Sequence, residues 1–266
     1  MEFLKLVRKR SFLSELVYTV LNIALAVAVL LIVRYTEAVW FAFLLVILSK
    51  WRVFAVRPRF WWANLRSNTV DFIVSLSVVL HMYTINEAPI SEDAKLLLLV
   101  GFTLAYIGWL LFIKPRSKRG FVVAQAGTAV FLGVSALFTV SFNWPVSVVV
   151  LGSWLIGYSA ARHVLSAYDE ETHGLFLSLA WGLVIAEIAW VSYHWAIAYP
   201  LPIFPSLMIP QAAIVISLVS FLVYKIYDSF YHHSKIRMSD VLLPILFTVS
   251  VLMVLLIVFN RVGTAI

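Results

Sequence analysis

Residues 12–33 read FLSELVYTVLNIALAVAVLLIV, an apolar run of 22 residues with a single charge at Glu15. As a helix the run extends about 33 Å at 1.5 Å per residue, enough to cross the roughly 30 Å hydrocarbon core of a bilayer. The basic stretch at residues 5–10 resembles the start of a signal peptide, but a cleaved signal has an apolar region of only about 7 to 15 residues. No small-residue cleavage site follows before Arg34. We therefore expect a retained first transmembrane helix.

Runs of the same kind follow along the whole chain. Hydrophobic residues make up 63% of the sequence and charged residues 12%, and the mean hydropathy is +0.98. A soluble domain is about half apolar and about a quarter charged, so a soluble fold is excluded. We predict an all-α transmembrane bundle that forms one membrane domain over residues 1–266. Its nine expected spans are residues 12–33, 37–56, 68–84, 96–113, 121–140, 145–162, 174–198, 209–226 and 240–260.

The second expected span, residues 37–56, is the least regular, because its purely apolar part ends at Ser49. For a full span, the side chain of Lys50 must extend towards the lipid headgroups. A short hairpin with the first span is the alternative.

The cations lie almost entirely on alternate loops. Of the 20 lysines and arginines, only Arg34, Lys95 and Arg261 lie on the other side of the expected spans. Cytoplasmic loops are enriched in lysine and arginine, so we expect a cytoplasmic N-terminus and, with nine spans, an external C-terminus. The net charge of +7 is then charge at a membrane surface and gives no reason to expect nucleic-acid binding.

Residues 50–66, KWRVFAVRPRFWWANLR, mix cations with aromatic rings. Aromatic rings favour the headgroup level and arginines favour lipid phosphates, so we expect this segment to lie in the interface of an anionic leaflet. An anchoring belt is the simpler interpretation, and a site that recognises a lipid or a partner is the alternative. The expected anchor residues are Trp51, Arg52, Arg57, Arg59, Trp61, Trp62 and Arg66.

Glu187 is the only ionisable residue near the middle of an expected span. His194, seven residues further on, shares its helix face about 10.5 Å away. The sequence offers Glu187 no intramembrane cation, so we expect a neutral acid that is hydrogen-bonded within the bundle. This pair is our candidate intramembrane polar site. Its role is either to tie helices together or to bind a proton, a cation or a polar headgroup.

Motifs for catalysis are absent from the sequence. There is no cysteine, no phosphate-binding Walker loop, no His-Glu-x-x-His and no Gly-x-Ser-x-Gly. Loops 169–173 and 228–233 contain acids and histidines, for which we favour helix-end and solvated roles over a metal site. We read Asp71 in the same way, as an acid near a helix start. We therefore predict no enzyme activity, no cofactor and no metal site.

Small residues recur every four positions in the fifth and sixth spans, at Ala129 and Gly133 and at Gly157 and Ala161. Such spacing lets helices approach closely, so we expect these two spans at the centre of the packing. Residues 199–211 contain four prolines and no charge, and we expect a non-helical cap there.

The stretch DEETHGLFLSLAWGLVIAEIAWVSYHWAIAYPLP at residues 169–202 continues through IPQAAIV and KIYDSFYHH to His233. These residues, about a quarter of the chain, resemble uncharacterised membrane proteins of small-genome candidate-phylum bacteria. The resemblance implies a bacterial inner membrane and supplies no site residues.

Two functional classes are compatible with the sequence. The first is a scaffold or subunit of a membrane complex, with anionic lipid and other membrane proteins as its partners. The second is a transporter or carrier for a proton, a cation or a small polar solute, with Glu187 and His194 lining its cavity.

Overall fold

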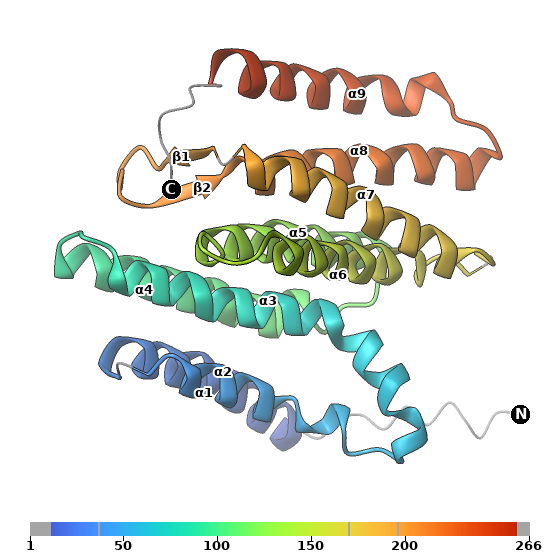
Figure 1. Ribbon diagram of the computed structural model, residues 1–266. Helices are drawn as coiled ribbons and strands as arrows, with labels where there is room; N and C mark the ends of the chain where they lie inside the picture. The colour runs from blue at the N-terminus through green and yellow to red at the C-terminus, as the bar shows by residue number, and fades with distance from the viewer. Residues whose placement is uncertain (1–11, 37, 170, 196, 260–266) are drawn as a thin grey trace, which may run out of the picture.

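The computed structural model describes residues 12–36, 38–169, 171–195 and 197–259, and about four fifths of them are helical. The helices run back and forth along one common direction (Figure 1). They are α1 (Phe12–Tyr35), α2 (Trp40–Ser49), α3 (Trp61–Glu87), α4 (Glu92–Gly108), α5 (Arg119–Val140), α6 (Val146–Leu165), α7 (Gly174–His194), α8 (Gln211–His233) and α9 (Met238–Met253). A π-helical turn extends α4 over Trp109–Ile113 and another extends α9 over Val254–Val258. The all-α prediction is confirmed.

Eight of these helices, all except α2, are long and apolar enough to cross a membrane. The span expected at residues 37–56 is instead the ten-residue helix α2, which is about 15 Å long and half the thickness of a hydrocarbon core. Two short 3-10 turns, Trp51–Val53 and Pro58–Phe60, then lead into α3. The structure thus shows a short hairpin of α1 and α2, in which α2 and the turns after it return the chain to the end of the bundle at which α1 begins.

The basic loops gather at one end of the bundle, which we call the basic end. The turns after α2, α4, α6 and α8 lie there, at the right of Figure 1. The opposite end holds the proline-rich segment, which forms a two-stranded hairpin of β1 (Ala198–Pro200) and β2 (Met208–Pro210). The strands are antiparallel, with Tyr199 opposite Ile209. This agrees with the expectation that the prolines prevent a helix.

Two buried apolar clusters hold the bundle together. One joins α1 to α4 around residues such as Val79, Met82 and Leu99, and the other joins α5 to α8 around Ile185 and Ile216. The helix α9 packs mainly on α8 and leaves most of its surface outside the bundle, as Figure 1 shows.

Glycines in α5 and α6 allow the closest helix approaches. A Cβ atom on Gly133 would lie 2.8 Å from Cγ2 of Ile73 in α3, and one on Gly157 would lie 2.7 Å from Cδ1 of Ile185 in α7. Because real Cβ atoms do not approach so closely, neither position has room for a larger residue. The small-residue prediction for these two helices is therefore confirmed.

Candidate functional site

A buried cluster of charges joins α2, α3 and α4 near the basic end. Asp71 of α3 accepts hydrogen bonds from Lys50, which follows α2, and from the indole Nε1 of Trp109 at 3.3 Å. The Nζ atom of Lys114 lies 2.8 Å from the same carboxylate. Lys50 is only 6% exposed, so its charge is removed from solvent and is balanced by Asp71.

This cluster corrects two expectations. Lys50 does not extend to the headgroups but turns inward onto Asp71. Asp71 does not cap a helix start, because α3 begins ten residues earlier at Trp61. The signal in the sequence was a lysine that interrupts an apolar run together with an aspartate inside the next one, but their pairing depends on how α2 packs on α3.

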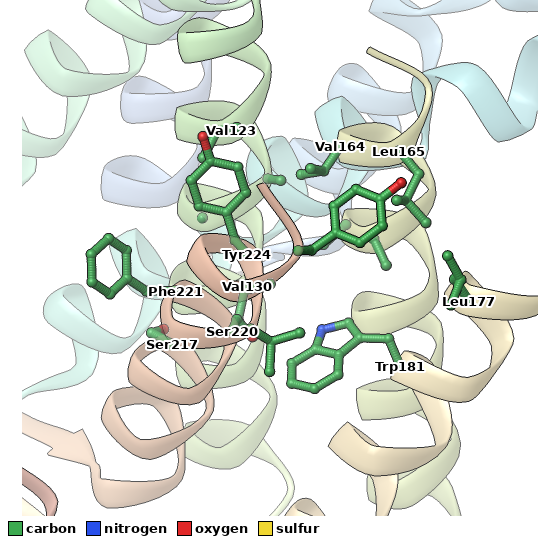
Figure 2. A pocket seen from close by; sticks show the side chains of 16 residues that line it. Val123, Val130, Val164, Leu165, Leu177, Trp181, Ser217, Ser220, Phe221 and Tyr224 are labelled. Carbon is green, nitrogen blue, oxygen red and sulfur yellow. The ribbon is translucent and has the colours of Figure 1, made fainter. Parts of the chain in front are cut away.

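A lateral recess lies between α7 and α8, and we call it the α7–α8 groove (Figure 2). It arises because α7 packs along α6 and α8 packs along α5, whereas α7 and α8 contact each other less. The groove has a volume of about 310 Å³. Its floor contains small residues such as Ala126, Gly127 and Ala160, and Trp181 of α7 points across it towards α8.

Two hydroxyl groups interrupt this apolar lining. Ser217 and Ser220 of α8 line the groove, and both hydroxyl oxygens are buried with no hydrogen-bond partner among the described residues. A buried hydroxyl without a partner costs about 1–3 kcal/mol. A molecule that fills the groove and offers a hydrogen bond would remove that cost.

Tyrosines and acids close the groove at the basic end. Tyr168, between α6 and α7, donates its hydroxyl to Asp228 of α8 at 2.8 Å, and the guanidinium of Arg119 lies over its ring at 4.3 Å. Burial, and then the hydrogen bond to Asp228, raises the pKa of the Tyr168 phenol, so this phenol stays a donor. Tyr227 donates to Glu171 in the same way. Two of the acids suspected in loops 169–173 and 228–233, Glu171 and Asp228, thus bind tyrosines, and Glu170 lies outside the described residues.

The two residues of the expected intramembrane site are not brought together. Glu187 is exposed at the outer surface of α7 and lines an open cavity of about 440 Å³ that also involves Gln211 of α8. No hydrogen bond links it to another described residue, in contrast to the expected bond within the bundle. His194 is not part of this cavity and instead packs its ring against Trp190 and Tyr193.

The expected interface segment, residues 50–66, forms largely exposed turns and the first residues of α3 at the basic end. The side chain of Trp62 is 73% exposed, and Trp51, Arg52, Arg57, Arg59 and Trp61 are also exposed. The indole of Trp61 donates to the carbonyl oxygens of Phe54 and Val56, which holds the turns against the start of α3. Arg66 lies apart from this group, in a cavity beside α6.

Comparison of the chain with family models, curated proteins and solved structures gives no match.

Proposed function

We propose that the chain is a multi-pass protein of a bacterial inner membrane that works without enzymatic activity as a scaffold or subunit of a membrane complex. The observation that carries this proposal is the α7–α8 groove with its two unpartnered hydroxyl groups. The buried ion pair of Lys50 and Asp71 supports it, because these two charges neutralise each other instead of lining a pathway. The exposed segment from Trp51 to Trp62 anchors the protein on anionic headgroups.

The topology belongs to the same proposal. The chain passes through the membrane nine times, with the short α2 as the second pass, a cytoplasmic N-terminus and an external C-terminus. Lys50 and Lys114 both pair with Asp71, which supports this, since both residues then lie at the basic end. Seventeen of 20 cations fall on the cytoplasmic side of this arrangement.

A reporter fused after Ile266 tests the topology. We expect an enzyme that is active only in the periplasm to be active in this fusion, and one that is active only in the cytoplasm to be inactive. The same reporters inserted after Ser117, in the turn between α4 and α5, should show the opposite pattern. Cytoplasmic activity of the Ile266 fusion would require an even number of passes and would contradict the proposal.

The occupant that fits the groove is a transmembrane helix of a partner protein. A lipid acyl chain matches the apolar walls but has no group to pair with Ser217 and Ser220. A helix with a polar side chain matches both features, and hydrogen bonds of this kind contribute about 0.6–2 kcal/mol between membrane helices. The small residues of the floor permit close approach of the partner helix.

Filling the groove should release the partner. Gly127 lines the groove, and a Cβ atom added there would meet no atom within 4 Å, so we expect Gly127→Leu to place its side chain in the recess. We expect the assembly extracted from native membranes in mild detergent to fall to the mass of the free protein. Gly101→Leu is the matched control, because Gly101 of α4 has equally open space but lies outside the groove.

Two results decide the groove proposal. An unchanged assembly in Gly127→Leu would exclude the groove as the docking site. A large assembly formed by the purified protein alone, and lost in Gly127→Leu, would identify a second copy of the chain as the occupant.

The cavity beside Glu187 favours a second candidate function, a carrier for a proton, a cation or a small polar solute. An exposed acid that lines a cavity with Gln211 has the donor and acceptor groups that such a solute needs. His194 would act at the external end of this path, although it does not line the cavity.

Side-by-side variants of Glu187 separate the two functions. Because the described structure gives Glu187 no bonding partner, we expect both Glu187→Gln and Glu187→Ala to fold with nearly unchanged stability. A scaffold should retain its cellular function in both variants, whereas a carrier should lose it in both. Complementation of a deletion strain, with expression matched by immunoblot, is the measurement.

A further inference from the structure

A cavity at the basic end gathers cations from two helices and a turn. It lies between the first turns of α3, the turn from α4 to α5 and the last turn of α6, and its volume is about 520 Å³. Ligand sites in proteins occupy about 300–1,000 Å³, so the space suits a small ligand or a lipid headgroup. Its charged lining residues are Arg66, Lys114, Arg116 and Arg162, and no acid among the described residues lines it. We call it the basic cavity.

These cations have little internal compensation. Asp71 pairs with Lys114 but also with the buried Lys50, so one carboxylate faces two ammonium groups. No ion pair joins Arg66, Arg116 or Arg162 to another described residue. Glu171 lies near Arg162 across Gly174, but its carboxylate oxygens accept from the backbone N–H of His173 and from Tyr227.

Buried hydrogen bonds hold the cavity in shape. Gln125 of α5 is 5% exposed, and its Nε2 donates to the carbonyl oxygens of Ile113 and Arg116, at 2.7 and 2.9 Å. Its Oε1 lies 2.7 Å from Nε2 of His163 in α6. The turn that bears Lys114 and Arg116 is thereby fixed to the helix end that bears Arg162, so the cations remain together without a bound ligand.

Ordinary positive charge on a cytoplasmic loop does not require this arrangement. Solvated cations repel one another and gain nothing from a shared concave site, whereas an anion between them is attracted to all of them. Guanidinium groups pair with phosphate oxygens in a bidentate geometry, and a lysine adds a point charge. The cavity also lies at the end of the bundle where lipid phosphates of the adjoining leaflet would be found.

We propose that the basic cavity binds a phosphate group, carried by the headgroup of an anionic phospholipid or by a phosphorylated solute of the cytoplasm. Arg116 and Arg162 donate hydrogen bonds to the phosphate oxygens. Lys114, which is held by Asp71, adds its positive charge from the side of α4. Gln125 and His163 are positioning residues. This inference does not depend on the α7–α8 groove.

Two binding measurements distinguish the sources of the phosphate. In the first, the detergent-purified protein is titrated with phosphatidylglycerol or phosphatidylcholine and the retained lipid is counted by native mass spectrometry. In the second, protein in nanodiscs of phosphatidylcholine alone is titrated calorimetrically with glycerol 3-phosphate and with inorganic phosphate. Saturable binding in the lipid arm alone assigns the cavity to a headgroup, and binding in the second arm assigns it to a solute.

The double variant Arg116→Gln/Arg162→Gln should weaken that binding by about tenfold or more. Lys235→Gln/Arg237→Gln removes the same charge at the same end but outside the cavity, and we expect a change of less than about twofold. Arg162→Lys keeps the charge but loses the bidentate geometry, and it should weaken the binding less than the double variant does. If the double variant does not fold, Arg116→Gln alone applies the test, because Arg116 is exposed and holds no structural contact with an acid.

Three results would overturn the proposal. They are the absence of saturable binding in both arms, binding that the cavity variant leaves intact, and equal weakening in the cavity variant and the control. Equal weakening of phosphate binding in both variants would mean that the binding depends only on the net charge of the basic end.

Discussion

Asp71→Ala should destabilise the protein more than other single substitutions, by about 3–5 kcal/mol, because it leaves the charge of Lys50 buried without a counter-charge. Lys50 is only 6% exposed and cannot regain full hydration without moving α2 away from α3. Trp109 would also lose the acceptor of its indole N–H. Reversible unfolding in mixed micelles with increasing SDS is the measurement, with the helical circular dichroism signal as its readout.

The partner variant provides the internal control. Lys50→Met/Asp71→Leu replaces the pair by apolar side chains of similar size, and such replacements of buried ion pairs are often neutral or stabilising. Lys114 keeps contact with solvent in this variant, since its side chain is 33% exposed. We expect the double variant to recover most of the stability that Asp71→Ala loses, which gives a large coupling energy in the mutant cycle.

An exposed ion pair at the opposite end gives the contrast. Arg34 of α1 bonds Glu92 of α4, whose side chain is 65% exposed. Glu92→Ala should change the stability little, because water replaces the lost partner. A loss for Asp71→Ala as small as that for Glu92→Ala would show that the Lys50 cluster is hydrated and would contradict its burial.

Gly157→Ala should have the next largest effect, a loss of about 1–3 kcal/mol through overpacking between α6 and α7. The added Cβ would lie 2.7 Å from Cδ1 and 3.0 Å from Cβ of Ile185. Ile185 is fully buried, so its side chain has no space into which to withdraw, and the helices must separate. The same unfolding measurement applies.

Gly101→Ala and a compensating double variant are the controls. Gly101 of α4 has open space for a Cβ atom, so its replacement should be neutral or slightly stabilising, because alanine is the better helix former. Gly157→Ala/Ile185→Ala removes the contact with Cδ1 of Ile185 and should lose less than the two single variants together. Strict additivity would mean that the two residues do not limit the approach of α6 and α7.

The position of Glu187 shows what helix periodicity can and cannot predict. The sequence correctly places Glu187 well inside a long apolar helix, and the helix is observed over Gly174–His194. Periodicity also places His194 on the same face, but a face is defined relative to the helix and not to its neighbours. The packing of α7 on α6 turns Glu187 outward, to a cavity that His194 does not line.

The sequence by itself determined that the chain is a helical membrane protein, because the length and polarity of each apolar run are local properties that the bilayer constrains directly. It also determined which loops are basic and which segment cannot be helical, since the effects of charged residues and prolines depend on the local sequence alone. Only the tertiary structure decided that Lys50 turns inward to Asp71, that α7 and α8 separate into a groove, and that Arg66 and Arg162 share a cavity. These features depend on the rotation and approach of helices that are distant in the chain, as with Asp71 and Trp109, 38 residues apart. The packing of small residues such as Gly157 fixes that approach, and a pattern along a single helix does not contain the identity of its neighbour.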